Sequence, residues 1–253
     1  MIPRTKAMAA VLTGILAALC SCVSLGSQSE STLHPSFAMQ QGTFWVYRGT
    51  VRWYDMQLQK RVSSVVTSKC EVVRTMHGDG FVAALMRGFP WDFDWSDGQA
   101  DRHDWLVVET SAGDFHVLNN EALAKNLKRL ENPSDSLQGI LSDDDLFLRL
   151  PIKKGMKFCD PESRKRPDGR YCWVVASTHE TPLNNVKGIK PGKYTSFLLQ
   201  YVTNPDDTEM EFVPGLGFIA YRYHHHGSVA DTEMELVEYH AAKDTQAMPG
   251  EMR

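Results

Sequence analysis

The feature that most constrains this fold is a succession of short alternating segments rich in β-branched and aromatic residues. The first, Thr43–Tyr54 (TFWVYRGTVRWY), places one set of side chains on each face of an extended strand. Similar segments, separated by glycine- and proline-containing turns, recur as far as His240. Many strands at short intervals are typical of antiparallel sheets. We therefore predict a mainly β (α+β) fold, a single antiparallel curved sheet or incomplete barrel with a short helical insert.

The helical insert is predicted at residues 119–143. Leu123, Leu127 and Leu130 recur at helical spacing in NNEALAKNLKRLEN, and a proline follows this segment. The segment that begins at Ser134 indicates a second short helix. The amphipathic first helix is also a candidate lid over the concave face of the sheet.

The amino-terminal segment has the layout of a secretory signal. Two basic residues, Arg4 and Lys6, precede an apolar run of 13 residues, which is shorter than the roughly 20 that a membrane-spanning helix needs. The run ends in Leu19-Cys20-Ser21-Cys22, which resembles the lipobox of bacterial lipoproteins. This resemblance implies removal of residues 1–21 and lipidation of Cys22. The alternative is a cleaved signal with incidental cysteines.

These features predict four parts of the chain. A signal peptide (1–21) is followed by a lipidated flexible tether (22–41), a single β-rich domain (42–240) and a disordered tail (241–253). Val23 after the lipidated cysteine favours sorting to the outer membrane. The expected location is the cell envelope, with the domain facing the periplasm or the cell surface.

The charge balance argues against nucleic acid as a partner. Removal of residues 1–21 takes Arg4 and Lys6 from the 27 Lys and Arg residues, leaving 25 against 31 Asp and Glu, a net charge near −6. The expected partners are the membrane, through the N-terminal lipid, and an envelope protein, lipid or glycan.

Three cysteines remain for the folded domain. Cys159 and Cys172 flank a polar loop, which outside the cytoplasm favours a disulfide that clamps a hairpin. Other pairings of the three cysteines stay open. Cys70 lies in a strand-like segment, where a buried inert thiol is the expected state. No second cysteine pair or nearby histidine completes a metal site with Cys159 and Cys172.

Two further groups of residues are candidate sites. In a strand His224 and His226 would share a face, which gives two ligands for zinc or copper, but exposed histidines at a strand end are the favoured explanation. Trp91, Phe93 and Trp95 alternate with acidic residues, which is the pattern of a ligand-contacting aromatic platform or of a half-buried strand. We expect no cofactor and no metal.

The acidic residues among these aromatics suggest two weaker possibilities. Asp92, Asp94 and Ser96 begin a calcium-loop pattern that then fails, because glycine and glutamate are missing from their required positions. Asp92, Asp94, Asp97 and Asp101 are the candidate carboxylates of a glycan hydrolase. No catalytic motif is present, and we assign no catalytic residue.

Two distant segments resemble a pattern in uncharacterised bacterial secreted and lipid-anchored proteins. GTFWVYRGT near the mature start carries a W-x-Y strand, and EMEFVPGLGFIAYRYHHHG near the end carries P-G-[VL]-G before a strand. The resemblance implies a β-rich extracytoplasmic domain and transfers no catalytic residue.

The expected function is a lipid-anchored envelope protein with a non-catalytic binding or scaffolding domain. The alternatives are a carrier or sensor of a lipid or other apolar ligand, and an envelope glycan hydrolase. Enzymatic activity is therefore left open, with binding favoured.

Overall fold

The structure is a computed structural model that describes residues 37–93, 102–118, 123–135, 137–225 and 230–242. These residues belong to one compact unit that begins at Leu33. Within them, twelve strands form one antiparallel sheet in the order β6-β5-β4-β3-β2-β1-β12-β11-β10-β9-β8-β7. The predicted fold class, a mainly β chain with a single curved antiparallel sheet, is confirmed.

The elements follow one another along the chain as short strands with little helix between them. They are β1 (Phe44–Asp55), β2 (Lys60–Gly78), β3 (Phe81–Arg87), the 3₁₀ turn η1 (Pro90–Phe93), β4 (Asp104–Thr110), β5 (Asp114–Leu118), α1 (Leu123–Leu130), β6 (Leu146–Arg149), β7 (Lys157–Phe158), α2 (Pro161–Arg164), β8 (Trp173–Pro182), β9 (Lys193–Val202), β10 (Asp206–Val213), β11 (Gly217–His225) and β12 (Ala230–His240).

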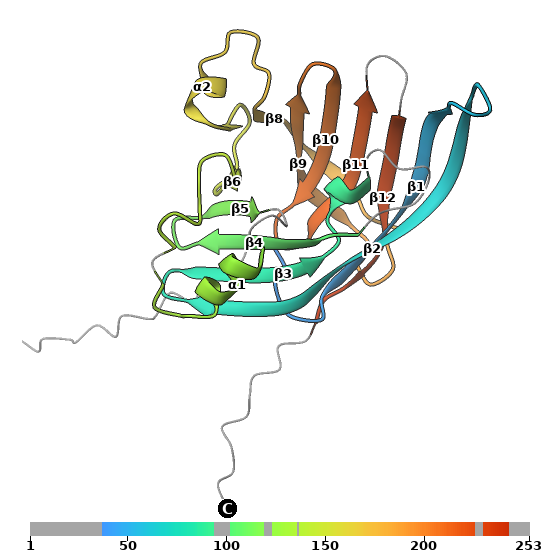
Figure 1. Ribbon diagram of the computed structural model, residues 1–253. Helices are drawn as coiled ribbons and strands as arrows, with labels where there is room; N and C mark the ends of the chain where they lie inside the picture. The colour runs from blue at the N-terminus through green and yellow to red at the C-terminus, as the bar shows by residue number, and fades with distance from the viewer. Residues whose placement is uncertain (1–36, 94–101, 119–122, 136, 226–229, 243–253) are drawn as a thin grey trace, which may run out of the picture. The chain divides into compact units, whose positions relative to one another are not determined.

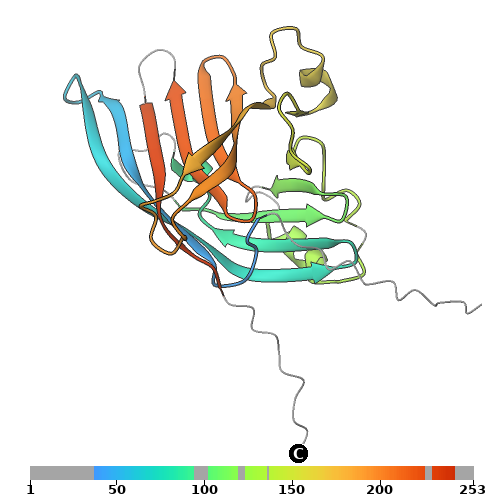
Figure 2. The same cartoon turned by 180° about the vertical axis from the view of Figure 1, so that it is seen from behind.

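The sheet is strongly curved and almost closes on itself. Figures 1 and 2 show β3–β5 running across the direction of β9–β12, with the long strand β2 bending between the two halves. The end strands β6 and β7 lie near each other but are not paired in the described part of the chain. We call the line along which they approach the seam.

Local irregularities in the central strands accompany this curvature. The register of β1 shifts between Val46 and Tyr47, and that of β2 shifts between Val72 and Arg74. Such bulges bend a strand and increase its twist. At Gly49 a Cβ atom would lie 1.8 Å from the backbone oxygen of Glu233 on β12, so only glycine allows these strands to pack this closely.

The concave side of the sheet is filled by side chains. The ring of Phe218 on β11 contacts the rings of Phe147 on β6 and Phe89 before η1, with centroids 5.5 and 5.6 Å apart. It also contacts Phe212 on β10 at 5.4 Å. Because these rings come from both halves of the sheet, the interior of the curve is the main hydrophobic core.

A second, smaller core lies on the opposite face of β2–β5. It contains Phe81, Ala83, Leu106 and Val108, and it is covered by α1 through Leu130. The helix therefore packs on the outer face and does not cover the concave face, so the lid expectation is wrong. Alternate residues of β3 enter the two cores, which explains why this strand is apolar throughout. No helix in the described ranges is long and apolar enough to cross a membrane.

The second predicted helix, after Ser134, does not form. The described residues from 137 to 145 make turns and bends. Asp135 binds the backbone N–H of Leu137 and the guanidinium of Arg129, and Leu137 and Gly139 have positive φ angles of 56° and 71°. Left-handed residues and side-chain hydrogen bonds to the backbone stop helix propagation here. The described helical part of the insert is α1 alone.

The folded region begins before the predicted boundary at residue 42. Phe37, Ala38 and Met39, which the sequence assigned to the tether, are buried in the main core. The ring of Phe37 stacks on Trp45 with centroids 4.9 Å apart, and a Cβ at Gly217 would lie 2.5 Å from that ring. Burial of three apolar side chains outweighs the ordering of this short segment. Residues 1–36 and 243–253 lie outside the described residues.

The two segments that carry the W-x-Y and P-G-L-G pattern are in direct contact. The indole Nε1 of Trp45 donates to the backbone oxygen of Leu216 at 2.7 Å. The hydroxyl of Tyr47 donates to the backbone oxygen of Phe218 at 2.8 Å, and burial raises the pKa of Tyr47. Both bonds are buried, so side chains of β1 supply the hydrogen bonds that these two backbone oxygens need.

The structure contains the disulfide predicted between Cys159 and Cys172. The short helix α2 in its loop was not predicted, although Asp160 and Pro161 are favourable helix-start residues. Asp160 Oδ1 accepts hydrogen bonds from the backbone N–H groups of Glu162 and Ser163 at 2.8 and 3.0 Å.

Candidate functional site

A pocket of about 310 Å³ opens at the seam, and three tryptophans form much of its wall. Trp91 comes from η1, Trp105 from β4 and Trp173 from β8. The complete lining, which defines the seam pocket, is Trp91, Trp105, Val117, Asp144, Asp145, Leu146, Phe147 and Trp173. The volume lies at the lower end of the range for small-molecule sites, about 300–1,000 Å³.

The aromatic rings of the seam pocket contact one another at steep angles. Trp91 meets Trp105 with centroids 5.4 Å apart and planes at 69°, and it meets Phe147 at 5.4 Å and 78°. Trp173 lies roughly parallel to Trp91, with centroids 6.2 Å apart. All three tryptophans are only partly buried. The wall therefore offers ring surface in more than one direction.

Asp92, directly after Trp91, positions part of this wall from behind the pocket lining. Its carboxylate accepts hydrogen bonds from Trp105 Nε1 at 3.1 Å and from His103 Nδ1 at 3.0 Å. It also accepts from the backbone N–H groups of Phe89 at 3.0 Å and His103 at 3.2 Å. The residue is 7% exposed. A buried carboxylate with four donor groups is a structural anchor, and it fixes the position of the Trp105 ring.

The aromatic platform predicted from sequence is represented here by Trp91. The side chain of Phe93, and Trp95 with Asp94, Asp97 and Asp101, lie outside the described residues. Sequence reasoning missed Trp105 and Trp173, which are 14 and 82 positions beyond Trp91. The available signal was that each is a tryptophan at the start of a strand-like segment, but only the seam brings the three together.

Two carboxylate residues complete the lining. Asp144 and Asp145 precede β6 in a turn, where Asp144 is exposed and Asp145 half-buried. Ser142 Oγ donates to Asp145 Oδ2 at 2.6 Å. The acidic run that the sequence presents before LFLRLP therefore supplies two acidic residues to an aromatic pocket.

Cys70 lies within the main core rather than at a reactive surface. Its side chain is 1% exposed, and it is the free cysteine of the described chain. Burial, followed by the nearby charge of Asp92, strongly raises the pKa of the thiol. A thiol in this state is a poor nucleophile, as expected from the sequence.

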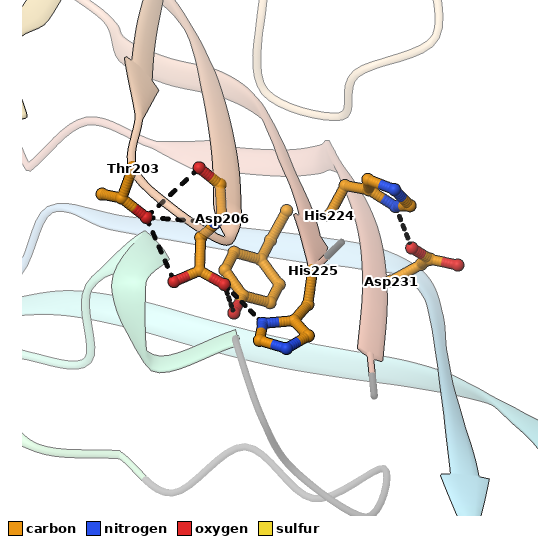
Figure 3. Close-up of polar contacts among 6 residues, drawn as sticks. Thr203, Asp206, His224, His225 and Asp231 are labelled. Atoms are coloured by element: carbon orange, nitrogen blue, oxygen red, sulfur yellow. Dashed lines mark hydrogen bonds and ion pairs between the residues drawn. The ribbon is translucent and has the colours of Figure 1, made fainter. Parts of the chain in front are cut away.

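A second polar group lies at the open ends of β10–β12 (Figure 3). The carboxylate of Asp206 accepts hydrogen bonds from His225 Nδ1 and from the hydroxyl of Tyr223, the latter at 2.8 Å. Burial alone would raise the pKa of Asp206, but the bonds from His225 and Tyr223 outweigh it and hold that pKa below its usual range. Thr203 Oγ1 also contacts the carboxylate at 3.3 Å.

Of the candidate metal ligands His224 and His226, His224 alone is among the described residues. His224 points away from His225 and pairs with the carboxylate of Asp231, while His226 lies outside the described residues (Figure 3). Among the described residues, no group of three or more His, Cys, Asp or Glu side chains is arranged to hold a metal ion.

A serine, a histidine and an acid do meet elsewhere, which the sequence did not reveal. Glu211 Oε1 on β10 accepts hydrogen bonds from Ser196 Oγ at 2.8 Å, His179 Nε2 at 3.0 Å and Thr181 Oγ1. In a catalytic triad the histidine stands between the serine and the acid. Here the carboxylate of Glu211 stands between the serine and the histidine. The three side chains therefore supply hydrogen bonds to a buried carboxylate and do not form a triad.

The fold and the pocket define a class of architecture: an almost closed antiparallel sheet that leaves an aromatic pocket where its two ends approach. No family model matches the chain, and no curated protein matches it.

The comparison with solved structures gives two weak matches. One is a protein described as exported, with a YmcC-like fold, from Bacteroides fragilis; it is 10% identical, with 81% of this chain and 98% of that chain covered at a TM-score of 0.39. The other, described as a lipoprotein from Parabacteroides distasonis, is 10% identical, with 81% and 97% covered at a TM-score of 0.35. At this identity and these TM-scores, no residue's role is transferred to this chain.

Proposed function

We propose that this chain is a lipid-anchored protein of the bacterial cell envelope that binds a small ligand in the seam pocket. The observation that carries the proposal is the convergence of Trp91, Trp105 and Trp173 from three separate elements on one opening. Large aromatic side chains left partly exposed at a concavity are typical of binding sites. Asp92 supports this reading because it fixes one of the rings in advance of binding.

The proposal favours binding over the alternatives of a lipid carrier and a glycan hydrolase. The concave face, where a carrier would hold an acyl chain, is occupied by the rings around Phe218. Of the four candidate hydrolase carboxylates, Asp92 is engaged by four donor groups. The seam pocket is an aromatic-lined concavity that lies outside this filled interior.

The anchor is proposed from the sequence. The lipobox-like Cys22 implies acylation, and more than one acyl chain gives stable membrane attachment. The disulfide between Cys159 and Cys172 is in keeping with an oxidising compartment. Incorporation of labelled palmitate should be lost in Cys22→Ala protein, together with membrane attachment. Retention of both would refute the anchor while leaving the pocket untouched.

Ligand-observed NMR tests the pocket without assuming a ligand. Purified protein is screened by saturation transfer against a mixed library of sugars, amines, carboxylates and apolar fragments. We expect hits that disappear in Trp91→Ala protein and persist in Trp53→Ala protein, whose tryptophan does not line the pocket. A screen without such hits would overturn the proposed function.

A further inference from the structure

Resting on the proposed binding function of the seam pocket, we propose that its ligand is a quaternary ammonium group. The first argument is charge. The lining contains Asp144 and Asp145, and none of its described residues is Lys, Arg or His. Two carboxylates without a cationic residue in the wall disfavour an anion and attract a cation.

The aromatic rings supply the second argument. A cation within about 6 Å of a ring centroid is attracted by the negative face of the ring, and tryptophan is the strongest of the aromatic side chains in this respect. The seam pocket contains three tryptophans and Phe147, with planes at angles of 69° and 78° between neighbours. Several aromatic rings around one concavity are the arrangement that recognises alkylated ammonium groups.

Neutral ligands make poorer use of the same wall. An apolar ligand would stack on the rings, but it would displace water from the carboxylates of Asp144 and Asp145. The hydrogen bonds between that water and the carboxylates would not be replaced, which would weaken binding. The indole N–H of Trp105 is not a donor for a neutral polar ligand, because it is already bonded to Asp92. A quaternary ammonium group places its methyl groups against the rings, while its positive charge is attracted both by the ring faces and by the two carboxylates.

Calorimetric titration of the full-length protein, in a detergent without a choline headgroup, tests this assignment. The probes are choline and its neutral isostere 3,3-dimethylbutanol, which has the same shape without the charge. We expect choline to bind at least about tenfold more tightly. The double variant Asp144→Asn/Asp145→Asn should weaken choline binding about tenfold, and added salt should weaken it in the wild type. Asp143→Asn is the matched control, because Asp143 belongs to the same acidic run but does not line the pocket.

The outcomes separate this inference from the proposed function. Equal binding of the two probes would overturn the ammonium assignment and leave the pocket as a binding site. Absence of choline binding, with other hits in the fragment screen, would do the same. Absence of every ligand in both experiments would overturn both proposals.

A third titrant, phosphocholine, distinguishes the source of the ammonium group. Binding of phosphocholine as tight as that of choline would point to a lipid headgroup. Weaker binding, as repulsion between the phosphate and the two carboxylates would cause, would point to free choline-like solutes. Both results support the same cation chemistry.

Discussion

The indole Nε1 of Trp105 donates to the carboxylate of Asp92 at 3.1 Å, and this bond ties the wall of the seam pocket to a buried acid behind it. The acid belongs to η1 and the indole to β4, so the bond also joins two elements of the fold. Asp92 is buried and does not line the pocket. The position of the Trp105 ring therefore depends on a residue outside the proposed binding surface.

Removal of this carboxylate should destabilise the fold. Asp92→Ala leaves four donors without their acceptor, and one unsatisfied buried donor costs about 1–3 kcal/mol. We expect a loss of at least about 2 kcal/mol in the free energy of unfolding, measured by urea denaturation. Asp104→Ala, which removes an exposed partner of Arg87 at 3.4 Å, is the control and should cost less than about 1 kcal/mol. Equal losses in the two variants would contradict the anchoring role of Asp92.

The disulfide should stabilise the protein through the loop that it closes. Cys159 and Cys172 are 13 residues apart, and closure of a loop of this size contributes about 3 kcal/mol in the chain-entropy model. The free energy of unfolding of the double variant Cys159→Ser/Cys172→Ser, measured by urea denaturation, is expected to be lower by that amount. Peptide mapping without reduction should show the two cysteines in one linked peptide, and two free thiols there would refute the pairing.

Cys70 should be unreactive in the folded protein. Its thiol is buried and its pKa is strongly raised, so little thiolate forms near neutral pH. A thiol-specific chromogenic reagent at pH 8 should detect this cysteine only after urea is added. The additional reagent signal that appears after urea is added should be missing in Cys70→Ala protein. Rapid modification under native conditions would show that the core opens at this position.

Acid should destabilise the protein partly through Asp206. Its pKa is below the usual range in the folded state, whereas in the unfolded chain it is about 3.9. As the pH falls, the unfolded state therefore takes up the proton first. The stabilisation is present above the unfolded pKa and is lost as the pH falls through the folded pKa.

The comparison with Asp206→Asn isolates this contribution. Between pH 5 and pH 2 the free energy of unfolding of the wild type should fall more steeply than that of the variant. His225→Gln, which removes the imidazole bonded to Asp206, should shift the slope toward that of the variant. Parallel slopes for wild type and Asp206→Asn would refute the depressed pKa.

The sheet was predictable because alternation is a local signal. TFWVYRGTVRWY shows which side chains share a face whatever lies next to the strand. The absence of a helix after Ser134 could not be predicted from the same kind of pattern. There Asp135 binds the backbone of Leu137, and tertiary packing holds Leu137 and Ile140 in the outer core without a helix.

The candidate site was predictable only in part. Trp91 was singled out by its neighbours in sequence, but its partner Trp105 is on β4 and its partner Trp173 is on β8, and the approach of the two ends of the sheet brings them to one pocket. Trp173 lies 82 and 68 positions after Trp91 and Trp105, and nothing in the local pattern around any of the three residues encodes their meeting. Similarly, the contact of Trp45 with Leu216 spans 171 positions.

The most direct test of the account is the response of the tryptophan side chains to a bound cation. The chain has six tryptophans, and each gives one indole N–H signal in a nitrogen–proton NMR spectrum, assigned through single Trp→Phe variants. On addition of tetramethylammonium, the signals of Trp91, Trp105 and Trp173 should move together with one binding constant. The signal of Trp45, which is buried against Leu216, should stay in place. An unchanged set of the three pocket signals, or a shift confined to other tryptophans, would contradict the seam pocket as the site of ammonium binding.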